Sequence, residues 1–148
     1  MNRPLKVLQL GCGSMGTRRL RDLAPRTDVA LRLYDARADR RAAAFSRFHV
    51  EGFTSLEAAL GWQPDALVIS TPPGTKGSLA QWALAHGVHH FVEADIWSYG
   101  VAAEAARQPN LVSAPSLSFA FLPVVRALIE RVPETIGRLL GYQFGLAG

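Results

Sequence analysis

Three glycines near the start of the chain have the spacing G-x-G-x-x-G, directly after the mostly apolar run K-V-L-Q-L; they are Gly11, Gly13 and Gly16. Where such a turn joins a strand to a helix, the first glycine permits a tight turn and the second lets backbone N–H groups approach phosphate oxygens. The third allows the helix to pack closely on the strand. The N-terminus of the helix, with Ser14 and Met15, adds partial positive charge. The spacing therefore predicts that these five residues bind the pyrophosphate of a dinucleotide.

An acidic residue follows the second apolar run, V-A-L-R-L-Y, at the distance that such a site requires. Asp35 lies nineteen residues after Gly16, where a carboxylate normally accepts hydrogen bonds from the ribose hydroxyls of the adenosine. A carboxylate there repels a 2′-phosphate, which favours NAD over NADP. Arg37 and Arg40 carry the opposite charge close by and leave NADP possible. The sequence thus predicts a nicotinamide dinucleotide cofactor, with Asp35 and Arg37 at its adenosine ribose.

A third candidate segment follows the apolar run A-L-V-I. Its residues come at the carboxyl end of a predicted strand, where open α/β sheets bind their ligands; they are Ser70, Thr71, Pro72, Pro73 and Thr75. Two prolines stiffen the turn and remove two N–H donors, so that the loop can press against a flat cofactor ring or a ribose. We interpret these five residues as cofactor contacts. The alternative is a rigid turn between a strand and a helix.

The elements that must position these residues alternate between strand and helix. This alternation predicts an α/β fold, a doubly wound and mostly parallel Rossmann sheet with helices on both faces. Apolar runs predict strands at 6–10, 30–34, 52–53, 66–70, 89–93 and 111–114. Helical spacing and capping signals predict helices at 15–23, 38–48, 76–86 and 101–107, and a short one capped by Ser55. Beyond residue 118 the pattern changes to an apolar helix at 119–131 and a strand at 137–144.

This change of pattern divides the chain into a dinucleotide-binding domain at 1–118 and a helix–strand extension at 119–148. One strand cannot form a domain, so it must pair with the sheet or with another chain, or be the start of a further domain. The helix of the extension has a stripe too apolar for a free surface. We expect a homo-oligomer or a partner chain to bind through residues 119–146. The alternative is packing of the stripe on the chain's own sheet.

Composition excludes several classes of protein. The chain has 148 residues, 49% of them hydrophobic, which suits one folded domain and argues against disorder. No apolar run approaches the ~20 residues that span a bilayer, and the first strand begins too early to leave room for a signal peptide. A cytoplasmic protein without membrane contact is therefore expected. The first 50 residues carry eleven basic against four acidic side chains, but without stacking aromatics or a helix-turn-helix pattern, so no nucleic-acid partner is expected.

The single cysteine and the histidines predict no metal site. Cys12 alone rules out an internal disulfide and a multi-cysteine zinc site. It occupies a variable position of the glycine turn, where we interpret it as a filler rather than a reactive thiol. His86, His89 and His90 lie at the end of a predicted helix and the start of a predicted strand, and we assign them no metal or general-base role.

Several of these segments together resemble the N-terminal part of the Gfo/Idh/MocA oxidoreductases. The resemblance rests on the first strand with G-C-G-S-M-G, the acid Asp35, the stretch S-T-P-P-G-T and the strand that ends at Glu93. The passage E-T-I-G-R at 134–138 resembles the entry into that family's C-terminal domain. The resemblance implies a Rossmann domain that binds NAD or NADP, with Glu93 near the cofactor, in an enzyme that acts on a sugar, a polyol or a related compound.

The chain departs from that family at a position linked to catalysis. Relatives usually have E-K-P after this strand, and their lysine is thought to assist catalysis, whereas Glu93 is followed here by Ala94 and Asp95. Alanine cannot donate a proton or stabilise an alkoxide. The family's other catalytic residues lie in its C-terminal domain and match nothing here, so no catalytic residue is assigned. Two hypotheses stay open: an oxidoreductase, or part of one, without the full catalytic machinery, and a non-catalytic dinucleotide sensor or partner subunit.

Overall fold

The computed structural model describes residues 3–93, 104–105, 107–116 and 123. The first compact unit of the chain runs from Met1 to Ser116. Its strands are β1 (Leu5–Leu10), β2 (Val29–Tyr34), β3 (Gly52–Phe53), β4 (Ala66–Ile69), β5 (His89–Val92) and β6 (Ser113–Pro115). Its helices are α1 (Ser14–Leu23), α2 (Ala38–Phe48), α3 (Leu56–Gly61) and α4 (Pro73–Ala85).

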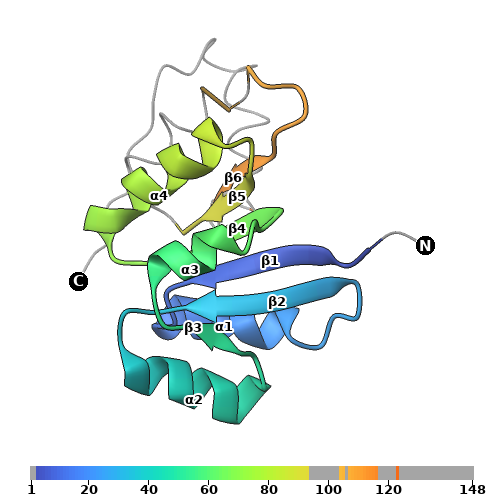
Figure 1. Cartoon of the computed structure of the whole chain (residues 1–148). Coiled ribbons are helices and arrows are strands. Elements are labelled where there is room, and N and C mark those ends of the chain that lie inside the picture. Colours follow the sequence, from blue (N-terminus) through green and yellow to red (C-terminus); the bar gives the residue numbers. More distant parts are fainter. Residues whose placement is uncertain (1–2, 94–103, 106, 117–122, 124–148) are drawn as a thin grey trace. The chain divides into compact units, whose positions relative to one another are not determined.

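Within the described part of the chain the strands form one parallel sheet of six, in the order β3-β2-β1-β4-β5-β6. Figure 1 shows this order from bottom to top. Strands β2 and β3 extend the sheet to one side of β1, and the chain then crosses back to place β4 on the other side of β1. The strand order therefore reverses between β1 and β4, where the carboxyl ends of the two strands border a crevice suited to ligands.

Helices cover both faces of the sheet, as a parallel sheet buried on both sides requires. On one face, α3 and α4 pack on the central strands, in a cluster that includes Leu8 and Leu10 of β1 and Leu67 and Ile69 of β4. On the other face, α1 and α2 form a second cluster around Leu33 of β2. Successive residues of β2 serve the two cores, since Leu33 lies in the second cluster and Tyr34 packs against the first. The predicted doubly wound Rossmann sheet is confirmed.

The predicted cap of α3 is confirmed, and a glycine ends α4. The Ser55 hydroxyl accepts a hydrogen bond from the backbone N–H of Ala58 at 3.1 Å and caps α3. Gly87 has φ +65° and donates its N–H to the carbonyl of Leu84, so that it ends α4 in the left-handed conformation which glycine adopts without strain.

The start of α4 differs from the prediction. A break over 71–74 and a helix from Lys76 were expected, but α4 begins at Pro73. Proline suits the first turn of a helix, because its missing N–H needs no partner there and its φ is already helical. Pro73 and Thr75 therefore belong to α4 rather than to a loop. Helix α1 begins one residue early, and β6 is shifted to Ser113–Pro115 by its pairing with β5.

Some predictions fall outside the described residues. Of the predicted helix at 101–107, only residues 104, 105 and 107 are described, and of the extension at 119–148 only residue 123. Among the helices that are described, none has the length and apolar character needed to cross a membrane.

Strands β5 and β6 are joined by a buried histidine. The ring of His90 is 3% exposed, with Nδ1 3.1 Å from the carbonyl oxygen of Val88 and Nε2 2.8 Å from the hydroxyl of Ser113. A carbonyl can only accept, so Nδ1 carries the proton and Nε2 accepts from Ser113. Burial lowers the pKa of His90, and the charge of His89 lowers it further, while the Val88 carbonyl opposes the shift. The folded state therefore favours the neutral ring.

We expect the stability of the domain to fall as the pH drops below the unfolded pKa of histidine, about 6.5. Between the unfolded pKa and the lowered folded pKa, His90 is protonated in the unfolded chain but stays neutral in the folded chain. Because the unfolded state binds more protons there, lowering the pH through this window favours unfolding. Urea unfolding from about pH 7.5 to about pH 5 measures this loss. In the variant His90→Gln the part of the loss due to this residue should disappear. An identical pH dependence in both proteins would contradict the assignment.

Candidate functional site

At two of the three positions in the turn after β1, the packing of the protein leaves no room for a side chain, so glycine is required whether or not a ligand binds. Gly11 has φ +86°, and a Cβ there would lie 2.6 Å from the carbonyl oxygen of Ser70, at the end of β4. A Cβ on Gly16 would lie 1.9 Å from the carbonyl oxygen of Gly11, so that α1 can pack on the turn only with glycine at this position. The two glycines fix the turn against β4 and α1.

Gly13 differs from the other two glycines, because a Cβ there would meet only the side chain of Arg40, at an ordinary 3.7 Å. Gly13 is also the N-cap of α1 and makes no side-chain hydrogen bond, and no acidic residue lies in the first turn of this helix. The first N–H groups of a helix lack partners within it. Those of Ser14, Met15 and Gly16 thus form a positive end without a protein side chain as cap, which suits an anion such as a pyrophosphate.

A buried glutamine of β1 is hydrogen-bonded to the backbone of the glycine turn. The Gln9 side chain is 0% exposed, and its Nε2 donates to the carbonyl of Gly11 at 2.8 Å and to that of Leu10 at 3.2 Å. Its Oε1 has no hydrogen-bond partner among the residues that the structure describes. Sequence reasoning did not single out Gln9, although a polar residue inside the apolar run of β1 was a visible signal. Its hydrogen bonds hold the backbone of the turn in place.

Asp35 links the glycine turn to the segment after β2. The side chain of Asp35 is 7% exposed; Oδ2 accepts from the backbone N–H of Cys12 at 2.7 Å and Oδ1 from that of Arg37 at 2.9 Å. The guanidinium of Arg40 approaches Oδ2 at 3.7 Å, while that of Arg41 donates to the backbone carbonyl of Asp35 at 2.7 Å. A carboxylate has about four acceptor sites, so each oxygen keeps one for a further donor.

Several of the predicted site residues meet at a pocket of about 450 Å³ beside this carboxylate. Those that line it are Gly11, Asp35, Arg37, Ser70, Thr71, Pro72 and Thr75; the other lining residues are Leu10, Tyr34, Ala36, Arg40, Leu56, Ser78 and Leu79. The predicted residues that do not line it are Gly13, Ser14, Met15, Gly16, Pro73 and Glu93. The pocket thus joins the ends of β1, β2 and β4, which are distant in sequence.

Two hydroxyl groups at this pocket have no hydrogen-bond partner in the described structure: Ser70 Oγ and Thr71 Oγ1, both buried. An unsatisfied buried polar group costs free energy, and each such case calls for an explanation. A ligand with hydroxyl or phosphate groups in this pocket would supply the missing partners. The donor and acceptor groups present therefore fit the ribose and phosphates of a dinucleotide.

Glu93 lies outside the pocket and is held by α1. Its buried carboxylate accepts a hydrogen bond from Arg19 Nε at 2.7 Å, and its backbone N–H donates to the carbonyl of Ile69 at 2.9 Å. The guanidinium of Arg19 also lies 4.8 Å from the ring centre of Phe91. Arg19 of α1 thus fixes the position of the Glu93 carboxylate after β5.

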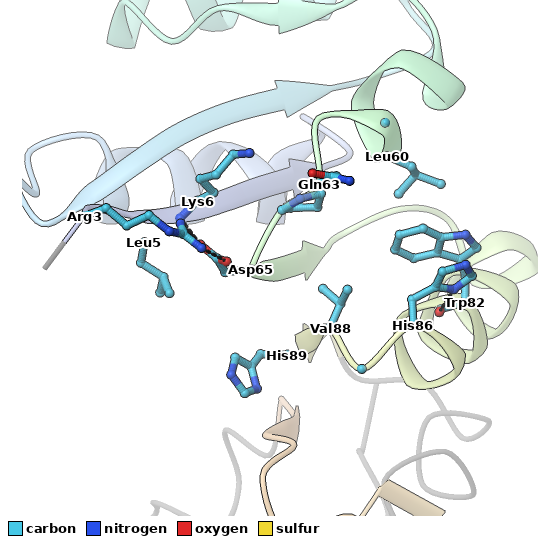
Figure 2. Close-up of a pocket in the computed structure, with 13 residues that line it drawn as sticks. Arg3, Leu5, Lys6, Leu60, Gln63, Asp65, Trp82, His86, Val88 and His89 are labelled. Carbon is cyan, nitrogen blue, oxygen red and sulfur yellow. Dashed lines mark hydrogen bonds and ion pairs between the residues drawn. The ribbon is translucent and has the colours of Figure 1, made fainter.

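A larger hollow of about 1090 Å³ lies at the opposite edge of the sheet, at the amino ends of β1, β4 and β5. Arg3 donates there to both carboxylate oxygens of Asp65 at 2.6 Å. Figure 2 shows this pair, with Trp82 beside His86. The hydrogen bonds from Arg3 are the main cause that lowers the pKa of Asp65 to about 2. No predicted site residue lines this hollow. Parallel sheets bind ligands at their carboxyl edge, so the smaller pocket is the candidate site.

We expect the thiol of Cys12 to be nearly inert in the folded protein. Burial raises its pKa to about 12, and the neighbouring Asp35 adds to the rise, against opposing effects of Arg40 and Arg41. Because the thiolate is the reactive form, a rise of about three units lowers its reactivity about a thousandfold near pH 8. A thiol-reactive disulfide reagent, compared before and after denaturation, measures the ratio. Similar rates in both states would contradict the interpretation of Cys12 as a filler.

The reversed strand order, the glycine turn and the acid at the end of β2 together define a Rossmann dinucleotide-binding domain. The model of the family described as "Oxidoreductase family, NAD-binding Rossmann fold", GFO_IDH_MocA, matches residues 5–97. The chain belongs to the Gfo/Idh/MocA oxidoreductase family, and the resemblance drawn from the sequence is confirmed.

Solved structures share the fold. GenD2 from gentamicin A biosynthesis, in complex with NAD, is 27% identical, with a TM-score of 0.72 over 93% of this chain and 42% of that one. Myo-inositol 2-dehydrogenase from Lactobacillus plantarum is 20% identical, with a TM-score of 0.71 over 89% and 42%. Biliverdin reductase from Synechocystis, in complex with biliverdin and NADP+, is 19% identical, with a TM-score of 0.72 over 87% and 43%. The chain thus spans less than half the length of these proteins. No curated protein matches it.

Proposed function

We propose that this chain binds NAD at the carboxyl edge of its sheet and supplies the cofactor site of an oxidoreductase that acts on a sugar, a polyol or a related compound. The observation that carries the proposal is the position of Asp35. Its buried carboxylate lines the pocket, is hydrogen-bonded to the glycine turn, and retains acceptor capacity for ribose hydroxyls. The substrate class follows the family and relatives such as myo-inositol 2-dehydrogenase.

Each predicted residue has a distinct task in this proposal. The N–H groups of Ser14, Met15 and Gly16 bind the pyrophosphate, and Gly13 leaves room for it. Asp35 accepts hydrogen bonds from the adenosine ribose, while the hydroxyls of Ser70 and Thr71 find partners on the cofactor. Pro72 and Thr75 form a stiff wall beside it, with Pro73 starting α4 behind that wall. When bound, a nicotinamide dinucleotide supplies or takes up a hydride.

NAD is the preferred cofactor in this proposal, with NADP as the weaker ligand. A 2′-phosphate would lie close to the carboxylate of Asp35, and like charges repel strongly in a partly buried site. Calorimetric titration with NAD+, NADH, NADP+ and NADPH tests the proposal. Tighter binding of the NAD pair would support it. If none of the four bound at millimolar concentration, the assignment would be wrong.

The alternative function is a non-catalytic dinucleotide sensor or partner subunit. It is favoured by Ala94, which occupies the place of the lysine in the E-K-P pattern of relatives. Glu93 is a proposed cofactor contact in both functions. An assay of the purified chain with NADH or NAD+ and a panel of sugars and polyols tests this alternative. Turnover by the chain alone would exclude the sensor and would also contradict the expected lack of catalytic residues, whereas binding without turnover is expected both of a sensor and of a chain that supplies only the cofactor site.

We propose further that copies of the chain, or a partner chain, assemble through residues 119–146. The apolar stripe in the sequence of this segment supports the proposal, since apolar surface of that extent is usually covered. Light scattering of the purified chain measures its mass in solution. A dimer or larger species is expected, and a strict monomer would count against self-assembly.

A further inference from the structure

Arg37, which lines the pocket beside Asp35, has its guanidinium held by a second acid. Arg37 Nε lies 3.1 Å from Asp39 Oδ1, and Arg37 Nη2 lies 2.6 Å from Asp39 Oδ2, so that Asp39 occupies the Nε–Nη2 side of the guanidinium. The two side chains are 61% and 65% exposed. Asp39 lies in the first turn of α2 and does not line the pocket. The pair therefore lies at the rim, with only the arginine facing the site.

We propose that Asp39 is a specificity-determining residue, which disfavours NADP by holding the guanidinium of Arg37. The inference rests on the proposed function, in which the adenosine ribose lies at Asp35. The planar fork that binds a carboxylate with two hydrogen bonds is the group that binds a phosphate in the same way. A nearby arginine is the usual partner of a 2′-phosphate in Rossmann domains. While Asp39 occupies the Nε–Nη2 side of the guanidinium, a 2′-phosphate must displace Asp39 or bind on the Nη1 side, and in both cases it meets the negative charge of Asp39.

The other two arginines around Asp35 make different contacts. Arg41 donates to the backbone carbonyls of Asp35 and Ala36, at 2.7 and 3.2 Å, and so supports the backbone after β2. Arg40 approaches the carboxylate of Asp35 at 3.7 Å and offsets its charge. Arg37 thus differs from Arg40, the other arginine that lines the pocket, because its guanidinium is paired with Asp39, which lies outside the pocket. Removing Asp39 frees this guanidinium and takes away no residue that lines the pocket.

The test compares NAD+ and NADP+ binding to the full chain and to Asp39→Asn by calorimetry. An exposed ion pair is weak, so the expected gain in NADP+ affinity is about fivefold, with NAD+ affinity changed by less than about twofold. Asp28→Asn is a matched control. The pair Arg26–Asp28 has the same spacing and nearly the same distances, 3.0 and 2.6 Å, but precedes β2 at the opposite edge of the sheet. This control should leave both affinities unchanged.

A double variant separates release of the guanidinium from simple loss of negative charge. In Arg37→Met with Asp39→Asn, the gain for NADP+ should vanish, because the proposed phosphate ligand is gone. A gain that persisted in the double variant would overturn the proposal, as would an unchanged ratio of affinities in Asp39→Asn. In both cases NAD+ binding by the unaltered chain would leave the proposed function intact. If the unaltered chain bound neither dinucleotide, the proposed function and this inference would both be wrong.

Discussion

Replacing Gly16 by alanine should destabilise the domain by about 3 kcal/mol and abolish dinucleotide binding. The added Cβ would lie 1.9 Å from the carbonyl oxygen of Gly11 and 3.1 Å from Gln9 Nε2. The carbonyl belongs to the backbone, which a side-chain rotation cannot relieve. Helix α1 must therefore move away from the turn, and its N–H groups move with it. Urea unfolding monitored by tryptophan fluorescence measures the first effect and calorimetry with NAD+ the second.

Gly61→Ala is the matched control for this substitution. Gly61 is the last residue of α3, and a Cβ there meets nothing within 4 Å in the described structure. Because alanine restricts the unfolded chain more than glycine does, this variant should be neutral or gain up to about 1 kcal/mol, with unchanged NAD+ affinity. If Gly16→Ala behaved like Gly61→Ala, the close packing of α1 on the turn would be refuted.

Removing the carboxylate of Asp35 should weaken NAD+ binding about a hundredfold, since hydrogen bonds from two ribose hydroxyls to a charged group contribute together about 3 kcal/mol. Asp35→Ala also leaves the backbone N–H groups of Cys12 and Arg37 without their acceptor. The glycine turn then loses its link to the segment after β2. The relative preference for NADP+ should rise at the same time, because the negative charge at the pocket is gone. Calorimetry with both dinucleotides measures the two effects.

Asp65→Ala separates the ligand role of Asp35 from its structural role. Asp65 likewise accepts from a backbone N–H, that of Lys6 at 2.8 Å, and pairs with an arginine, but at the amino edge of the sheet. The loss of Asp65 should lower stability without changing NAD+ affinity. Equal losses of affinity in the two variants would mean that Asp35 acts on the ligand only through the stability of the fold.

The two cores and the order of elements followed from patterns within the sequence. Apolar runs alternate with segments of helical spacing along the first 118 residues, which is the pattern of repeated βα units. The start of α4 was placed three residues late, because a proline pair signals both the end of a strand and the first turn of a helix. The choice between these depends on whether the following residues complete the helix, which is a property of the packed chain.

The sequence by itself predicted the class of site from glycines at 11, 13 and 16 and an acid after the second strand, with a spacing typical of a phosphate-binding turn. The tertiary structure decided what each of these residues does. Close backbone approaches explain why positions 11 and 16 are glycine, but they do not explain Gly13. The hydrogen bonds of Gln9 and the pairing of Arg37 with Asp39 depend on the directions of side chains. Spacing along a chain sets which elements meet, whereas hydrogen bonds and ion pairs depend on differences in distance of a few tenths of an ångström, which are fixed only after the elements pack.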